Sequence, residues 1–129
     1  MALEQKEQID ILGVGDMVTD TFIELESAWV ENDNSEKKDE LCMKFGDKLP
    51  YTDAVVVPAV GNAINASVSA SRLGLKSAVV SDTGDDEYAR ESLDALKKEN
   101  VGTEFITTHA HSKSNANFVL RFKAERTIL

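Results

Sequence analysis

The amino-acid sequence predicts one α/β domain in which a mainly parallel sheet is flanked by helices and extended by a small β layer. Short apolar segments alternate with two helical segments, which is the pattern of parallel strands joined by helical crossovers. The strand-like segments before Pro58 and after Ser114 have no helix between them, so they predict an added antiparallel layer. A length of 129 residues, with 42% hydrophobic and 29% charged side chains, fits a single soluble domain.

Short apolar runs define the predicted strands. The first run, residues 9–14, stops at Gly15 and predicts a buried strand that leads into a loop. The polar stretch 31–40 predicts a solvated hairpin tip, and Pro58 predicts the end of the strand before it. Further strands are expected at residues 22–25, 41–45, 55–57, 76–81, 105–108, 118–122 and 127–129.

Two segments have helical patterns. Residues 62–73 are rich in Ala and Ser and end at Gly74, which predicts a helix whose small side chains let it approach a neighbour closely. Residues 85–100 predict an amphipathic helix with acidic residues in its first turn and lysines in its last, as the helix dipole favours. Its apolar face is expected to carry Ala89, Leu93 and Leu96.

Charge and cysteine content restrict the partners and the compartment. The 23 acidic against 14 basic residues give a formal net charge of −9, which argues against nucleic acid and anionic membranes as partners. Cys42 is the single cysteine and cannot form an internal disulfide, and the N-terminal residues have no apolar leader pattern, so we expect a cytoplasmic protein. The uncharged run 54–71 contains Pro58 and Gly61 and predicts buried structure in a soluble fold, not a membrane span.

Three short motifs have simple structural explanations. Gly13 and Gly15 begin a dinucleotide-binding pattern that lacks its third glycine, so a tight turn that needs small residues is the favoured interpretation. Asp82-Thr83-Gly84 matches the triplet of aspartic proteases, but a predicted helix follows, and capping of that helix explains the acidic residues. His109 and His111 would lie on the same side of a strand as half of a metal site, yet nothing nearby completes it, and a solvated loop is the simpler interpretation.

The candidate site residues follow the first strand and open the first helix. Asp20 lies beyond the carboxyl end of the first strand, where open α/β sheets place ligand-binding groups, although capping of a turn is an equal alternative. Gly61, Asn62 and Asn65 open a helix, whose unpaired N–H groups and side-chain amides suit polar, hydroxyl-rich or anionic ligands. Simple capping by asparagine is the alternative explanation of these residues.

Four segments, in their order along the chain, resemble the ribokinase-like, or pfkB, carbohydrate kinase family. They are ILGVGDMVTD, VGNAINASVSASRLG, SDTGDDEYARESLDALKKENV and FVLRFKAERTIL. The chain departs from the family pattern at Val60, where a second glycine is usual, and at Ala89, another glycine position. The resemblance implies a partial ribokinase-like fold, in which residues 1–129 form the N-terminal portion of a kinase domain. Its small β lid would come from about residues 21–57 and part of 114–129.

The resemblance also implies site residues. Asp20 and Asn65 would anchor hydroxyl groups of the substrate, Gly61 and Asn62 would shape the floor of the pocket, and Asn117 would reach the same pocket. Asp82-Thr83-Gly84-Asp85 is similar to the catalytic signature of the family, but its position matches an earlier Gly-Asp-Asp turn. The catalytic signature is therefore expected in a C-terminal half that these residues do not include, so no catalytic residue or metal ligand is assigned.

The implied activity is ATP-dependent phosphorylation of a sugar or nucleoside hydroxyl, with ATP and Mg²⁺ as cofactors and a homodimer formed through the lid. The 129 residues alone are expected to be inactive. Two alternatives stay open at this point. One is a non-catalytic sugar-binding or dimerising module, and the other is a degraded gene product that does not fold stably.

Overall fold

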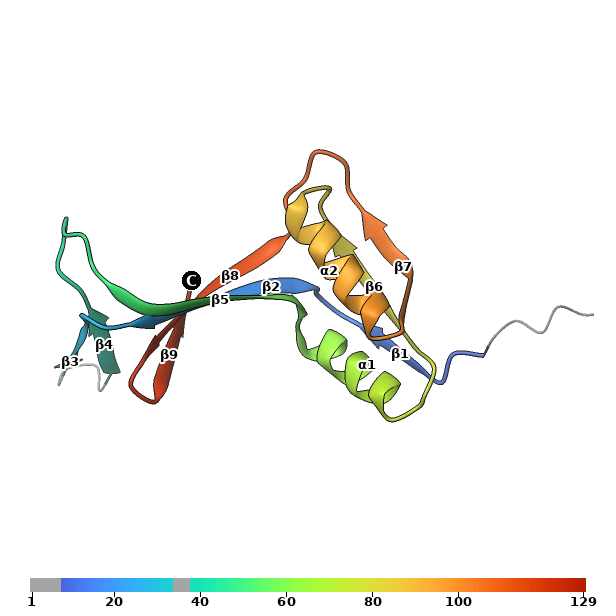
Figure 1. Cartoon of the computed structure of the whole chain (residues 1–129), viewed down its shortest axis with the longest axis horizontal. Coiled ribbons are helices and arrows are strands. Elements are labelled where there is room, and N and C mark those ends of the chain that lie inside the picture. The colour runs from blue at the N-terminus through green and yellow to red at the C-terminus, as the bar shows by residue number, and fades with distance from the viewer. Residues whose placement is uncertain (1–7, 34–37) are drawn as a thin grey trace, which may run out of the picture. The chain divides into compact units, whose positions relative to one another are not determined.

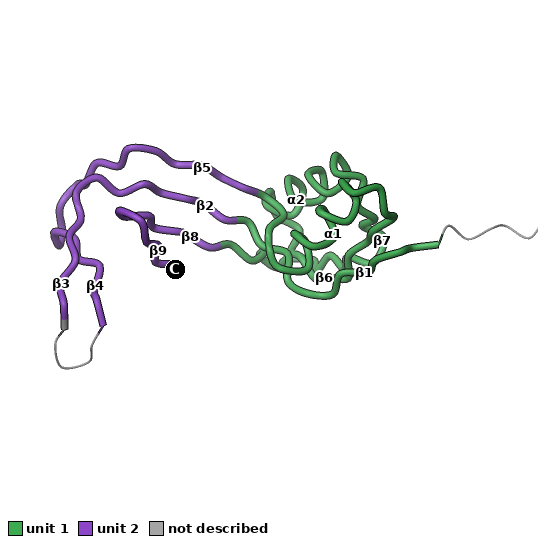
Figure 2. The backbone as a smooth tube through the Cα atoms, turned by 90° about the horizontal axis from the view of Figure 1, so that it is seen from below, with its two compact units in different colours: residues 1–19, 58–116 green, residues 20–57, 117–129 purple. Residues whose placement is uncertain are grey.

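The computed structural model describes residues 8–33 and 38–129 (Figure 1). The chain divides into two compact units, which Figure 2 shows in different colours. Unit 1 consists of Met1–Thr19 and Pro58–Ala116, and unit 2 of Asp20–Val57 and Asn117–Leu129. The segments of unit 2 overlap those expected for the lid, whose closure over a ligand stays a prediction.

Unit 1 contains a three-stranded parallel sheet. Its strands are β1 (Ile11–Val14), β6 (Ser77–Thr83) and β7 (Val101–Thr108), in the order β1-β6-β7. In the register of the two parallel pairs, Ser77 lies opposite both Ile11 and Val101. The predicted α/β class with a parallel sheet is therefore confirmed.

Helix α1 (Asn62–Arg72) precedes β6, and α2 (Glu87–Lys98) joins β6 to β7. Both crossovers run in the same direction along the sheet, so both helices cover one face of it (Figure 1). The close approach predicted for α1 is confirmed, because a Cβ atom at Gly13 would lie 2.4 Å from Ser67 Oγ and 2.8 Å from the backbone oxygen of Ala63. The glycine at position 13 is thus explained by helix packing and not by the tight turn that the sequence suggested.

The core lies between the sheet and these helices. Ile64 of α1, Val79 of β6 and Leu96 of α2 are fully buried. The buried face of α2 consists of Ala89, Ser92 and Leu96. Leu93, which was expected on the apolar face with Ala89 and Leu96, is half-buried, and the buried face also includes Ser92.

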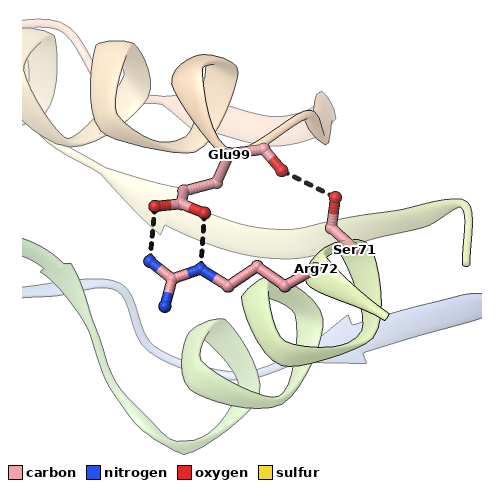
Figure 3. Close-up of polar contacts among 3 residues, drawn as sticks. All are labelled: Ser71, Arg72 and Glu99. Atoms are coloured by element: carbon pink, nitrogen blue, oxygen red, sulfur yellow. Dashed lines mark hydrogen bonds and ion pairs between the residues drawn. The ribbon is translucent and has the colours of Figure 1, made fainter. Parts of the chain in front are cut away.

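Hydrogen bonds from Ser71 and Arg72 to Glu99 join the C-terminal ends of α1 and α2 (Figure 3). Arg72, at the end of α1, donates from Nε and Nη2 to the two carboxylate oxygens of Glu99, at 2.8 and 2.6 Å. Ser71 Oγ donates to the backbone oxygen of Glu99 at 2.6 Å, so one C-cap residue of α2 accepts from both side chains. The hydrogen bonds from Arg72 hold the pKa of the Glu99 carboxyl below its usual range.

The turn between β6 and α2 is held by the carboxylate of Asp86. Asp86 is the N-cap of α2 and accepts from the backbone N–H of Ala89 at 3.1 Å. It also accepts from the Ser114 hydroxyl at 2.6 Å and the Ser114 N–H at 2.9 Å. These hydrogen bonds hold the pKa of the Asp86 carboxyl below its usual range, the bond from the Ser114 hydroxyl contributing most. The acidic residues that follow Thr83 therefore form a capped turn, as the sequence predicts.

The β layer consists of a sheet and a hairpin. The sheet has the order β5-β2-β8-β9, and the hairpin strands pair in antiparallel fashion. The strands of the sheet are β2 (Val18–Leu25), β5 (Tyr51–Val60), β8 (Asn115–Phe122) and β9 (Glu125–Ile128), and those of the hairpin are β3 (Trp29–Asp33) and β4 (Lys38–Cys42). Strands β8 and β9 are also antiparallel, which confirms the added antiparallel layer.

Some strand boundaries in this layer differ from the prediction. The bounds of the strand expected at residues 41–45 are wrong, because β4 covers Lys38–Cys42 and shares only residues 41–42 with it. The partner strand β3 was not predicted. Residues 34–37 of the expected hairpin tip lie outside the described residues. Strand β5 continues through Pro58, which the edge position of β5 allows, since an edge strand need not donate a hydrogen bond at every residue. In the described ranges, the helices are too short and too polar to cross a lipid bilayer.

Candidate functional site

The five predicted site residues belong to different units. Asp20 and Asn117 lie in unit 2, whereas Gly61, Asn62 and Asn65 lie in unit 1. Each group has its own geometry.

Asp20 and Asn117 form a hydrogen-bonded pair on the neighbouring strands β2 and β8. Asn117 Nδ2 donates to Asp20 Oδ1 at 3.0 Å, and both residues are half-buried. The bond orients the carboxylate and leaves Asp20 Oδ2 and Asn117 Oδ1 without a hydrogen bond to the described residues. Carboxylate and amide oxygens are hydrogen-bond acceptors and are suited to the O–H groups of a polyhydroxylated ligand.

The N-terminus of α1 depends on the glycine at position 61. Gly61 is the N-cap with φ 125° and ψ 156°, and a Cβ atom there would lie 2.4 Å from the backbone oxygen of Asp16. Any other residue would be strained and would clash with the backbone. Val60, where the family has a second glycine, does not have a positive φ, so the departure creates no backbone strain.

Asn62 and Asn65 occupy one side of the first turn of α1. They are exposed and spaced by three residues, which places them on the same helix face. The alternative that asparagine caps the helix is wrong, because Gly61 is the N-cap and no side chain caps this end. Within the described ranges, neither side-chain amide has a hydrogen-bond partner. The face therefore offers amide donors and acceptors beside the unpaired N–H groups of the helix.

The two histidines do not lie on one strand, so that part of the metal-site hypothesis is wrong. Strand β7 ends at Thr108, and His111 has a left-handed φ of 59° in the loop that follows. His109 Nε2 lies 2.6 Å from Asp82 Oδ1. The residues that the structure describes contain no group of three His, Cys, Asp or Glu side chains able to hold a metal ion.

Cys42 lies in β4 near two carboxylates. Desolvation by its surroundings and the negative charges of Glu31 and Glu40 raise the pKa of the thiol. A protonated thiol is a weak nucleophile, so this environment does not favour covalent chemistry at Cys42.

A hollow of about 360 Å³ lies in unit 2 apart from the predicted site residues. Its lining includes the apolar side chains of Leu41, Leu120 and Phe122 and the charged side chains of Asp39 and Arg126. Asp20 and Asn117 do not line it. The Asp20–Asn117 pair and the hollow of unit 2 are therefore separate features.

Sequence reasoning missed two buried hydroxyls near the predicted residues. Thr19 precedes Asp20 directly, and its Oγ1 lies 3.3 Å from Ser92 Oγ of α2. Ser92 also accepts a hydrogen bond from the N–H of Ala59, two residues before Gly61. The sequence does contain a signal for this contact. Ser92 follows Ala89 by three residues and precedes Leu96 by four, so a polar residue lies on the apolar face of the predicted helix.

Solved structures with the same architecture are ribokinase-like proteins. A putative ribokinase from Agrobacterium tumefaciens matches with a TM-score of 0.70 and 22% identity, over 92% of this chain and 34% of that one. A nucleoside kinase from Methanocaldococcus jannaschii matches with a TM-score of 0.71 and 16% identity, over 92% of this chain and 35% of that one. The chain therefore has a ribokinase-like fold over the part of these structures that it covers.

Sequence comparison adds the family. The pfkB family carbohydrate kinases match residues 27–129, so the chain belongs to this family. The ribokinase of Bacillus subtilis (strain 168) is 29% identical over 86 residues, which are 67% of this chain and 29% of the length of that protein. The chain thus spans about a third of the length of its relatives.

Proposed function

We propose that this chain binds the acceptor substrate, a sugar or nucleoside, of an ATP-dependent carbohydrate kinase. The observation that carries the proposal is the Asp20–Asn117 pair, because a partly buried carboxylate fixed by a neighbouring amide is suited to accept hydrogen bonds from hydroxyl groups. The exposed amides of Asn62 and Asn65 support it, since they have no structural role as caps. Membership of the pfkB family supports the same class of substrate.

ATP and Mg²⁺ are proposed as cofactors of the whole kinase. An uncharacterized sugar kinase from Pyrococcus horikoshii is known in complex with ATP, and a ribokinase from Cryptococcus neoformans in complex with ADP. The described residues contain no group of three His, Cys, Asp or Glu side chains that could hold a metal ion, so no residue of this chain is named as a Mg²⁺ ligand. The inactivity of the 129 residues, a homodimer through the lid and a cytoplasmic location stay predictions.

The carboxylate would act by binding and orienting the acceptor. Asp20 Oδ2 would accept a hydrogen bond from one hydroxyl, while the Asn117 amide holds Oδ1. A hydrogen bond to an ionised group contributes about 1.5–3 kcal/mol, so it would account for roughly a tenfold to hundredfold difference in affinity. In unit 1, the side-chain amides at the start of α1 are by themselves suited to hydrogen-bond hydroxyl groups.

Calorimetry with a panel of pentoses, hexoses and nucleosides tests the proposal. We expect Asp20→Asn to lower the affinity for the bound acceptor at least about tenfold, because it removes the negative charge while keeping the shape. Asp47→Asn is the matched control, since Asp47 is an exposed turn residue that accepts only from the N–H of Lys48 among the described residues. Equal affinities for the two variants would contradict the proposal. Product formation by the wild-type chain when ATP is added would contradict the expected inactivity of the 129 residues.

A further inference from the structure

A buried hydroxyl on α2 contacts both strands that lead to the predicted ligand-binding residues. Ser92 is 2% exposed and lies between the apolar residues Ala89 and Leu96 on the buried face of the helix. Its Oγ accepts a hydrogen bond from the backbone N–H of Ala59 at 3.1 Å and lies 3.3 Å from Thr19 Oγ1. One side chain therefore bonds to residues at the ends of β2 and β5 that belong to unit 1.

Ala59 needs this partner because of its backbone conformation. It has a φ of 54°, in the left-handed region that few non-glycine residues adopt, and it is almost fully buried. Without the Ser92 hydroxyl, the buried Ala59 N–H would lose this hydrogen-bond acceptor. The left-handed residue directs the chain through Val60 to Gly61, the N-cap of α1. Ser92 thus holds the start of the segment that leads to Asn62.

Thr19 is the second partner, and it comes directly before Asp20 in β2. Its side chain is 1% exposed, so the contact with Ser92 is shielded from water. A bond at Thr19 fixes the backbone from which the Asp20 side chain starts. Since Ser92 Oγ accepts from Ala59, its own proton is available for Thr19 Oγ1.

We propose that Ser92 is a positioning residue of the acceptor site. Its hydroxyl holds the backbone one residue before Asp20 and two residues before Gly61, although Ser92 itself is buried in the core of unit 1. This inference rests on the proposed function, in which those residues bind the acceptor. Small errors in the position of binding groups weaken recognition strongly, so loss of this hydroxyl should lower affinity more than its effect on stability predicts.

Ser77 provides a matched control for a purely structural role. It is 5% exposed, and its Oγ donates to the backbone oxygen of Ser67 at 2.8 Å. It lies at the start of β6, where neither it nor its partner precedes a predicted binding residue. Ser92→Ala and Ser77→Ala each remove one buried hydroxyl, so their effects on folding are comparable while their effects on binding should differ.

The experiment uses the full chain and measures stability, affinity and, in the absence of ligand, backbone NMR signals. Urea unfolding followed by circular dichroism gives the stability of Ser92→Ala and Ser77→Ala, and calorimetry gives their affinity for the sugar or nucleoside that the wild type binds. We expect at least about a tenfold loss of affinity for Ser92→Ala and less than twofold for Ser77→Ala. Ser92→Thr, which keeps the hydroxyl, should recover most of the lost affinity.

Backbone amide NMR spectra without ligand separate this inference from the proposed function. We expect the amide signals of Asp20, Gly61 and Asn62 to shift in Ser92→Ala and to stay in place in Ser77→Ala. Equal affinity losses in the two alanine variants, or shifts confined to the neighbours of Ser92 in α2, would overturn the positioning role. If the wild type binds no member of the panel, the proposed function fails, and the NMR shifts alone decide whether Ser92 holds both segments.

Discussion

Replacement of Asp86 by alanine should destabilise unit 1 strongly. The carboxylate accepts one hydrogen bond from the N–H of Ala89, as the N-cap of α2, and two from Ser114. Loss of an N-cap costs about 1 kcal/mol. Each lost bond from Ser114 costs about 1 kcal/mol more, a low value for a charged acceptor because Asp86 is partly exposed. We therefore expect the free energy of unfolding to fall by about 3 kcal/mol, which is about 2 M in the urea midpoint.

The assay can separate the two units, because each has its own spectroscopic probe. Both described helices lie in unit 1, so far-UV circular dichroism at helical wavelengths follows that unit. Trp29 is the single tryptophan and lies in unit 2, so its fluorescence follows the other unit. The helical transition of Asp86→Ala should move to lower urea. An unchanged helical midpoint would refute the assignment of Asp86 as the residue that holds this turn.

The partner and the charge of Asp86 provide two further checks. Ser114→Ala removes one of the same contacts, the hydrogen bond from the Ser114 hydroxyl, and keeps the bond from the backbone N–H. The double variant should therefore lose at least about 0.5 kcal/mol less than the two single effects combined. The pKa of the Asp86 carboxyl is lowered by folding, so its contribution is complete above the unfolded value of about 3.9 and is lost as pH falls through the lower folded value. Asp86→Asn should remove this pH dependence. For the double variant, additive effects of Asp86→Ala and Ser114→Ala on the free energy of unfolding would contradict a direct contact between the two side chains.

Three further substitutions, one of them with a control, test the packing of unit 1. Leu96→Ala should lower the free energy of unfolding by about 3 kcal/mol, since Leu96 is fully buried. The control is Leu73→Ala, because Leu73 is 82% exposed; it should lower the free energy of unfolding by less than about 0.5 kcal/mol in the same urea titration. Gly13→Ala should cost about 1–3 kcal/mol by overpacking against α1, and a normal urea midpoint would contradict the close approach of helix and strand. Arg72→Lys should lower the midpoint of thermal unfolding, because lysine cannot form the paired hydrogen bonds to Glu99. An unchanged midpoint would show that these hydrogen bonds do not stabilise the fold.

The parallel sheet and both helices could be predicted because local patterns determine them. The small residues of α1 and the terminal charges of α2 mark the helices within two residues of their ends. The hairpin was harder, because Glu31 and Glu40 face each other across β3 and β4 and the alternation of apolar residues is weak there. A strand whose side chains are mostly exposed leaves little hydrophobic pattern in the sequence.

The candidate site shows the same division between local and long-range information. The need for glycine at position 61 follows from one backbone angle and one close contact, and the sequence motif indicated that glycine. The bond between Asp20 and Asn117 joins residues 97 positions apart. The family resemblance indicated only that both residues reach one pocket, and the bond itself was not predicted. The contact of Ser92 with Ala59 spans 33 positions and depends on a left-handed residue that no local pattern announces.

Unit 2 consists of one insertion in a βαβαβ unit and one segment that follows this unit in the chain. Its longer segment, Asp20–Val57, enters the chain after β1 and before α1, and its shorter segment, Asn117–Leu129, follows β7. Both segments thus branch from the chain after the carboxyl end of a parallel strand, which is the end where open α/β sheets tolerate elaboration and bind ligands. Lengthening or replacing these two segments should leave the register of β1, β6 and β7 intact, because neither segment contributes a strand to that sheet.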